Sequence, residues 1–138
     1  MDKVNLEPYI FFNGNCREAM EFYKSVFGGE LFFQNMSDVP GDVPKMEGVT
    51  ENMVMHASLK GGDAAIMASD SPNASPQAKK ITLSLGGSDE QKMRKMFDNL
   101  AAGGKVTTPL RKEFWGDTFG NLTDKFGVDW MMNIGTAE

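Results

Sequence analysis

The sequence contains one short pattern twice, and this internal repeat limits the possible folds more than any other feature. Residues 15–31, NCREAMEFYKSVFGGEL, start polar, continue with apolar residues at helical spacing, and reach a Gly-Gly pair before an apolar residue. Residues 88–106, SDEQKMRKMFDNLAAGGKV, have the same order. A repeat of this kind indicates two copies of one supersecondary unit, each too small to bury its own apolar face. We expect the two copies to pack together and function to lie in the cleft between them.

Length, charge and cysteine content narrow the class of protein. The chain has 138 residues and a net charge of −5, and no run of Lys or Arg exceeds two residues, which argues against a nucleic-acid partner. The N-terminal residues lack a signal-peptide pattern and no segment is apolar enough to span a membrane, so no membrane partner is expected. The single cysteine, Cys16, excludes an intrachain disulfide and favours a cytoplasmic protein. Cys16 lies where a helix dipole can lower a thiol pKa, but with no partner residue evident we favour a structural thiol.

The first half of the sequence, about residues 5–70, has the pattern of a strand, a helix and three further strands. Asn15, with Glu18 three residues later, is close to a helix-capping box, and the Gly28-Gly29 pair is typical of a helix C-terminus near Phe27. Between the second and third strands, residues 37–52 are rich in Pro, Gly and acids and predict a long loop. Strands are predicted at 8–12, 31–33, 53–60 and 64–69.

The second half, residues 81–135, repeats this order after a linker of residues 71–80. Ser88 and Gln91 form a capping box before the second helix. Pro109 is predicted to end the strand that follows this helix. Strands are predicted at 81–85, 106–108, 119–123 and 129–134.

The two halves together predict an α+β fold in which residues 1–138 form a single domain of two tandem βαβββ modules. Each predicted helix has only one apolar stripe, so we expect both helices on the outer face of the sheets. The sequence lacks the glycine-rich strand-to-helix turn of nucleotide-like cofactor sites, the phosphate-binding loop and the GxSxG motif. We therefore expect no cofactor and no methyl-transfer activity.

Several segments match known proteins in the same order along the chain. They are PYIFFNGNCREAMEFYKSVFGGE (8–30), MHASLKGGDAAIMASD (55–70) and WGDTFGNLTDKFGVDWMM (115–132), the last preceded by Phe114. With these segments the chain resembles the vicinal-oxygen-chelate superfamily of glyoxalases, bleomycin-resistance proteins and extradiol dioxygenases, and in particular its PhnB-like branch. The resemblance implies a curved mixed sheet around a cleft, commonly completed in a homodimer. It implies less about chemistry, because this fold hosts many activities.

Metal enzymes of this superfamily take His, Glu or Gln ligands from the first and last strand of each module. By the resemblance, these positions fall near Pro8 and Ile66 in the first module and at Lys80 and Met131 in the second. None of these side chains is a usual ligand of a hard or borderline cation. We therefore expect a protein that binds no catalytic metal.

His56 is the only histidine in the chain and the only side chain with an ordinary pKa near neutrality. Strand alternation groups His56 with Val54 and Ser58, opposite Met53, Met55, Ala57 and Leu59. If the opposite face packs on the first helix, His56 faces the cleft, where it could bind a ligand or act as a general base. The alternative is a hydrogen-bonded histidine without a catalytic role.

Phe114, Trp115 and Asp117 form a second candidate ligand-binding group. The resemblance implies that this FWGD motif lies at the rim of the pocket, where aromatic rings can stack on an organic ligand and a carboxylate can pair with a donor. The alternative is a turn in which Trp115 covers the edge of the core and Asp117 caps the backbone.

Aromatic and methionine side chains complete the predicted site, because methionine lines adaptable apolar cavities. The leading hypothesis is a metal-independent protein that binds an aromatic or amphipathic small molecule in the cleft. The first alternative is a metal-dependent lyase, isomerase or dioxygenase, and the second is a metal-free enzyme that uses His56 as its catalytic residue. We expect a homodimer. The predicted ligand-binding residues are Tyr9, Phe11, His56, Met67, Phe114, Trp115, Asp117, Trp130 and Met131.

Overall fold

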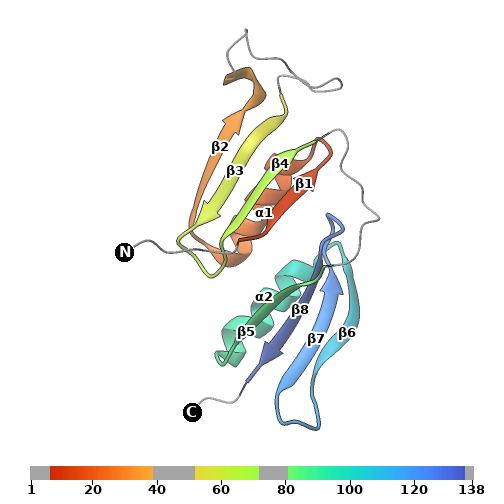
Figure 1. Cartoon of the computed structure of the whole chain (residues 1–138). Coiled ribbons are helices and arrows are strands. Elements are labelled where there is room, and N and C mark those ends of the chain that lie inside the picture. Colours follow the sequence, from red (N-terminus) through yellow and green to blue (C-terminus); the bar gives the residue numbers. More distant parts are fainter. Residues whose placement is uncertain (1–6, 39–51, 72–80, 136–138) are drawn as a thin grey trace. The chain divides into compact units, whose positions relative to one another are not determined.

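The computed structural model describes residues 7–38, 52–71 and 81–135 of the chain, which form two compact units divided between Ser75 and Pro76. Each unit has the same element order, a strand followed by a helix and three strands (Figure 1). This confirms the predicted α+β fold of two βαβββ modules. No helix among these residues is long and apolar enough to cross a membrane.

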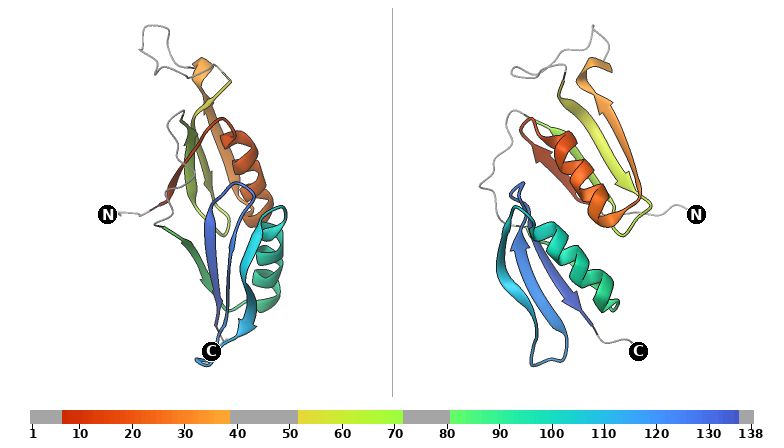
Figure 2. Two further views of the ribbon diagram at one scale, coloured as in Figure 1. Left: turned by 90° about the vertical axis from the view of Figure 1, so that its right-hand side faces the viewer. Right: turned by 180° about the vertical axis from the view of Figure 1, so that it is seen from behind.

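The first unit is a four-stranded mixed sheet with one helix across it. The sheet order is β1-β4-β3-β2, in which β1 is parallel to β4 and the other neighbours are antiparallel. The helix α1 lies across one face of this sheet (Figure 2). A short 3-10 turn, η1 (Met36–Asp38), follows the edge strand. The main elements are β1 (Tyr9–Phe12), α1 (Cys16–Phe27), β2 (Glu30–Asn35), β3 (Val54–Lys60) and β4 (Ile66–Asp70).

The second unit repeats this arrangement. Its sheet order is β5-β8-β7-β6, again with one parallel pair, β5 and β8, and two antiparallel pairs. The helix α2 contacts β6, β7 and β8 and lies across one face (Figure 2). Its elements are β5 (Leu83–Gly87), α2 (Glu90–Ala101), β6 (Lys105–Lys112), β7 (Thr118–Thr123) and β8 (Asp129–Ile134).

The two helices begin differently from the predictions. Asn15 is the N-cap residue of α1 as predicted, but its side chain makes no capping hydrogen bond. The N-cap of α2 is Asp89, whose carboxylate accepts from the backbone N–H of Lys92 at 3.2 Å, so the predicted capping box starting at Ser88 is wrong by one residue. The sequence offers two adjacent good caps there, and the structure uses the charged one, which also complements the helix dipole.

The repeated Gly-Gly pairs close each helix against a neighbouring hairpin. Gly28, Gly29 and Gly103 have positive φ angles, as expected for the residues that turn the chain after a helix. A Cβ atom at Gly29 would lie 2.5 Å from the carbonyl oxygen of Lys60, and one at Gly104 would lie 2.3 Å from that of Thr123. The second glycine of each pair is therefore needed because backbone approaches it closely.

The strand after α2 is longer than predicted, since β6 continues through Pro109 to Lys112. The strand lies at the edge of its sheet, where a residue without an N–H costs no ladder hydrogen bond on the open side. Its register with β7 shifts twice, between Val106 and Thr108 and between Thr108 and Arg111. The proline is accommodated within this irregular part of the ladder, so the prediction that it ends the strand is wrong.

Each sheet has one face against its helix and one open face. In the first unit the buried residues of α1 pack with buried residues of β3 and β4, which form most of the core of the unit. The alternation of strand residues turns the remaining side chains away from the helix. The side chains on the open face of the first sheet are therefore accessible to a ligand.

Candidate functional site

The candidate site is the open face of the first sheet, which we define by eight residues and call the aromatic–histidine face. The strand register sets Tyr9 beside Met67, Met67 beside Ser58, and Ser58 beside Phe32, so one row crosses all four strands. In the adjacent row, Phe11 on β1 pairs with Ser69 on β4, and His56 on β3 pairs with Gln34 on β2. The eight residues are Tyr9, Phe11, Phe32, Gln34, His56, Ser58, Met67 and Ser69.

Tyr9 joins the histidine to the aromatic part of this face. Its hydroxyl oxygen lies 3.1 Å from Nδ1 of His56, within hydrogen-bond distance. The ring of Tyr9 also lies 5.2 Å from that of Phe11 and 5.7 Å from the imidazole, measured between centroids. Two rings from β1 and the imidazole from β3 therefore form one continuous surface.

The aromatic side chains of this face are open to solvent. Phe11 and Phe32 are each 59% exposed and Tyr9 is 39% exposed, while His56 is partly exposed. Exposed aromatic surface of this extent on strands is uncommon, because such side chains usually fill cores. The pattern is typical of a surface that binds another molecule.

The aromatic–histidine face carries no Asp, Glu, Lys or Arg. The next paired position along β2 and β3 holds Glu30 opposite Lys60, one acid with one base. His56 is therefore the only basic group among the eight residues, and the acids on the four strands are Glu30, opposite Lys60, and Asp70 at the end of β4.

The grouping of side chains predicted for this strand agrees with the structure in part. Ala57 and Leu59 are fully buried, while His56 and Ser58 lie on the other side of β3. Val54, however, is fully buried and does not share the exposure of His56. The reason is a bulge: the register with β2 shifts between Gln34 and Asn35, which interrupts the alternation that the sequence predicts.

The open face of the second sheet holds a separate polar and aromatic group. Asp117 accepts a hydrogen bond from Nδ2 of Asn133 at 2.9 Å, so its carboxylate joins the β6–β7 turn to β8 rather than capping backbone. Asn133 pairs with Phe119, and Met131 lies one alternation earlier on the same strand, partly exposed.

The FWGD turn is solvent-exposed. Phe114 is 95% exposed and packs edge-on against Trp115, with 4.9 Å between centroids, and Trp115 in turn lies 6.2 Å from the ring of Phe119. Trp115 is 49% exposed. The turn therefore presents two exposed aromatic side chains, and a role of this motif in ligand binding stays a prediction.

Trp130 does not lie on an open face. It is 3% exposed, and its Nε1–H donates to Oδ2 of Asp124 at 2.9 Å. The same carboxylate accepts from the backbone N–H groups of Phe126 and Val128, so Asp124 fixes the β7–β8 turn and the indole together. The sequence predicts both Trp130 and Met131 in the site, but adjacent strand residues point to opposite faces, and the structure turns Trp130 into the core.

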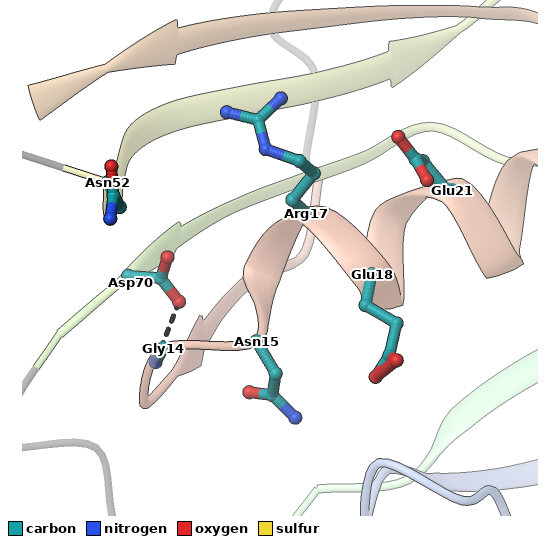
Figure 3. Close-up of a pocket in the computed structure, with 7 residues that line it drawn as sticks. All are labelled: Gly14, Asn15, Arg17, Glu18, Glu21, Asn52 and Asp70. Atoms are coloured by element: carbon teal, nitrogen blue, oxygen red, sulfur yellow. Dashed lines mark hydrogen bonds between the residues drawn. The ribbon is translucent and has the colours of Figure 1, made fainter.

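A polar hollow of about 400 Å³ lies at the start of α1 (Figure 3). At its base Oδ1 of Asp70 accepts from the backbone N–H groups of Gly14 and Cys16, each at 2.9 Å, and Oδ2 accepts from Val54 at 2.9 Å. Asp70 is buried and accepts from one first-turn amide of α1, that of Cys16, and from Gly14 just before the helix, so a carboxylate already lies where a helix N-terminus would otherwise attract an anion. The hollow is lined by Gly14, Asn15, Arg17, Glu18, Glu21, Asn52 and Asp70.

The thiol of Cys16 is part of this buried cap. Burial raises the pKa of Cys16 from 9.0 to about 12, the nearby Asp70 carboxylate adds to the rise, and Arg17 opposes it. The helix dipole therefore does not produce a reactive thiolate, and the interpretation of Cys16 as a structural thiol is the one that the geometry favours.

The positions that correspond to the superfamily's metal ligands do not fit a metal. Pro8 has no side-chain donor, Ile66 is buried in the core, and Met131 offers only a thioether, while Lys80 lies outside the described residues. Within residues 7–38, 52–71 and 81–135, no three His, Cys, Asp or Glu side chains are grouped so that they could hold an ion together.

Sequence reasoning missed three members of the aromatic–histidine face, namely Phe32, Gln34 and Ser69, whereas Ser58 is grouped with His56 by strand alternation. The Leu31-Phe32-Phe33 run is apolar at every position, so no alternation shows which ring faces outward. The cation–π contact of Arg17 with Phe33, 4.5 Å from the ring centroid, identifies Phe33 as the ring on the helix side. Gln34 and Ser69 join the face through the pairing of strands, which no local stretch of sequence encodes.

Known proteins resemble this chain over nearly its whole length. Residues 5–132 match the family model described as the Glyoxalase/Bleomycin resistance protein/Dioxygenase superfamily. Protein YjdN of Escherichia coli (strain K12) is 33% identical over 138 residues, with 94% of each chain covered. The crystal structure of protein PA1353 from Pseudomonas aeruginosa is 36% identical, covers 98% of this chain and 100% of its own, and has a TM-score of 0.83.

Two solved structures of lower identity share the fold. A PhnB protein from Bacillus cereus, described as a putative 3-demethylubiquinone-9 3-methyltransferase, is 24% identical, with 96% of this chain and 100% of that chain covered and a TM-score of 0.74. A bleomycin-binding protein complexed with bleomycin is 16% identical, with 96% and 99% covered and a TM-score of 0.57. At these identities the likeness shows the fold alone, in agreement with the fold predicted from the sequence.

Proposed function

Because the chain belongs to the glyoxalase/bleomycin resistance/dioxygenase superfamily, we propose that it binds a small aromatic or amphipathic molecule on the aromatic–histidine face, without a metal ion. One observation carries the proposal: Tyr9, Phe11 and His56 form a connected group of rings that is open to solvent. A mostly apolar and aromatic lining with a few polar groups is the usual composition of a small-molecule site.

Two further observations support a small organic ligand. Met67 lies beside Tyr9 in the sheet and offers a flexible, polarisable contact for an aromatic ligand. A protein of the same fold binds bleomycin, an organic molecule, which supports a ligand of this general kind for this chain as well. The open face of the second sheet, with Phe114, Trp115, Asp117 and Met131, is proposed as a separate ligand-binding surface of its own unit.

The absence of a metal requirement is proposed from donor chemistry. Pro8, Ile66 and Met131 offer no oxygen or nitrogen side-chain ligand, and a divalent ion bound only by such groups would keep its charge uncompensated. A metal-dependent lyase, isomerase or dioxygenase would need other ligands. A metal-free enzyme that uses His56 as general base is the second candidate, since His56 lies partly exposed on the face and is held by Tyr9.

The experiment that tests the proposal is a binding titration with a neutral aromatic probe, 2-naphthamide, followed by calorimetry. We expect a dissociation constant below about 1 mM, and a loss of about three- to tenfold in Phe11→Ala, because one aromatic contact contributes about 0.5–1.5 kcal/mol. Ile81→Ala is the matched control, because Ile81 is also an exposed apolar side chain, 76% exposed, but lies outside both faces. Absence of binding, or equal losses in the two variants, would contradict the proposal.

Assembly and location are proposed as well. We propose a homodimer, in which exposed apolar side chains on an edge strand, such as Val106 on β6, provide surface for a symmetric contact. Sedimentation at micromolar concentration should give a dimer, and a monomer would count against it. A cytoplasmic location is supported by the single unpaired cysteine, Cys16.

A further inference from the structure

The contact between Tyr9 and His56 restricts how the histidine can hydrogen-bond to anything else. A phenol O–H is more acidic than a neutral imidazole N–H, and an imidazole nitrogen is a more basic acceptor than a phenol oxygen. The favoured neutral pair therefore has the Tyr9 hydroxyl donating to Nδ1 of His56 across the 3.1 Å contact. In this arrangement the proton of the neutral imidazole resides on Nε2, which is then a donor.

No acidic side chain on the strands of the first sheet accepts a hydrogen bond from Nε2 of His56. None of the eight residues of the aromatic–histidine face is an acid, and among the described residues no side chain hydrogen-bonds to Nε2. Of the acids on the four strands, Glu30 is opposite Lys60, and the Asp70 carboxylate is directed to three backbone N–H groups. Glu7 lies just before β1, outside the eight residues.

We propose that the ligand of this face is an aromatic carboxylate, whose carboxylate accepts a hydrogen bond from Nε2–H of His56 while its ring packs on Tyr9 and Phe11. The inference rests on the proposed function and names its ligand class. Tyr9 has two roles here: its ring contacts the ligand, and its hydroxyl is a positioning group that keeps the imidazole in the tautomer with a donor on Nε2.

A carboxylate suits this surface better than a neutral acceptor. Hydrogen bonds to an ionised acceptor are about twice as strong as neutral ones, and the face has no acid that would repel the anion. When the imidazole is protonated, His56 supplies a countercharge, and it is the only basic side chain among the eight residues of the face. An aromatic carboxylate should therefore bind more tightly as the pH falls from 8 to 6, while a neutral aromatic amide should not.

The test compares 2-naphthoate with its neutral isostere 2-naphthamide by calorimetry at pH 6 and pH 8. We expect 2-naphthoate to bind at least about tenfold more tightly than the amide at pH 6, with the ratio falling to about threefold at pH 8. His56→Gln keeps a polar side chain of similar size but cannot become cationic. It should remove the pH dependence, and at pH 6 it should weaken 2-naphthoate by a larger factor than it weakens 2-naphthamide.

Tyr9→Phe is the second variant, because it keeps the ring and removes only the hydroxyl. At pH 8 it should weaken 2-naphthoate about threefold and weaken 2-naphthamide by a smaller factor. His56 is the only histidine, so its ring nitrogens give unique NMR signals. We expect the Nε2–H tautomer in the wild-type protein at pH 8 and a mixture of both tautomers in Tyr9→Phe.

The outcomes separate this inference from the proposed function. Equal affinities for 2-naphthoate and 2-naphthamide at pH 6 would overturn the carboxylate inference and leave the proposed function standing. A dominant Nδ1–H tautomer in the wild-type protein would overturn the positioning role of Tyr9. Failure of both compounds to bind would overturn both proposals. If His56→Gln does not fold, as judged by circular dichroism, the Tyr9→Phe variant and the tautomer measurement still decide.

Discussion

The side chains of Tyr9 and His56 meet at 3.1 Å although they are 47 residues apart in the sequence. The parallel pairing of β1 with β4 and the antiparallel pairing of β4 with β3 bring them to one face of the sheet. Exposed aromatic rings adjoin them and no charged side chain lies among the residues of that face. The position of the only histidine on an uncharged aromatic surface is the basis of the functional proposals.

We expect Asp70→Ala to destabilise the protein by about 3 kcal/mol or more, because three backbone N–H groups lose their acceptor. Asp89→Ala is the matched control, since Asp89 caps α2 with one hydrogen bond at an exposed position, and it should cost about 1 kcal/mol. Urea unfolding followed by circular dichroism measures both. Equal losses in the two variants would show that the buried Asp70 network is not the stronger cap.

The role of Asp70 shows what local sequence patterns omit. The partners of its carboxylate are the backbone N–H groups of Gly14, Cys16 and Val54, which lie 56, 54 and 16 residues away. No window of the sequence around Asp70 contains these groups, so a helix cap supplied by another strand could not be predicted. The local cap predicted at Asn15 has the right position but a side chain that makes no capping bond.

We expect Trp130→Phe to lower the free energy of unfolding by about 1–3 kcal/mol, because the buried Asp124 carboxylate loses one of its donors. Trp115→Phe should stay within about 0.5 kcal/mol, since Trp115 lies on the surface. Each variant leaves a single tryptophan, so acrylamide should quench the remaining fluorescence strongly in Trp130→Phe and weakly in Trp115→Phe. The reverse order of quenching would contradict the assignment of Trp130 to the core.

The sequence predicts the positions of the strands more reliably than it predicts which face of the sheet each side chain occupies. Buried and partly exposed residues alternate regularly in Asp129–Ile134. Strict alternation therefore places Trp130 and Met131 on opposite faces of the sheet, and this could have been predicted from the sequence. The bulge that buries Val54 and the continuation of β6 through Pro109 depend on pairing with a neighbouring strand. Both are consequences of tertiary structure, which propensity and periodicity do not encode.

We expect stability to decline with rising pH above about 9 more steeply in the wild-type protein than in Cys16→Ala. The folded state raises the pKa of Cys16 from 9.0 to about 12, so between these values the unfolded chain releases a proton that the folded chain retains. The stabilisation is complete below pH 9 and is lost as the pH rises toward 12, with a slope of at most about 1.4 kcal/mol per pH unit. Parallel profiles of unfolding free energy in the two proteins would contradict a buried thiol.

We expect Zn, Ni or Mn to change the melting temperature by no more than about two degrees. A metal bound to the native state at 100 times its dissociation constant would stabilise by about 2.7 kcal/mol, which corresponds to several degrees for a chain of this size. A shift of that size that His56→Ala abolishes would make His56 a metal ligand and favour the metal-dependent alternative. Differential scanning calorimetry before and after chelation provides the measurement.

The most direct test of the central claim, that the aromatic–histidine face binds an aromatic ligand, is an NMR titration of methyl-labelled methionines with 2-naphthamide. Met67 lies on the face beside Tyr9, whereas Met93 and Met96 are buried residues of α2 and serve as internal controls. The account predicts a saturable shift of the Met67 methyl signal, with the two α2 methyl signals unchanged. An unchanged Met67 signal at saturating probe, or shifts confined to Met93 and Met96, would contradict it.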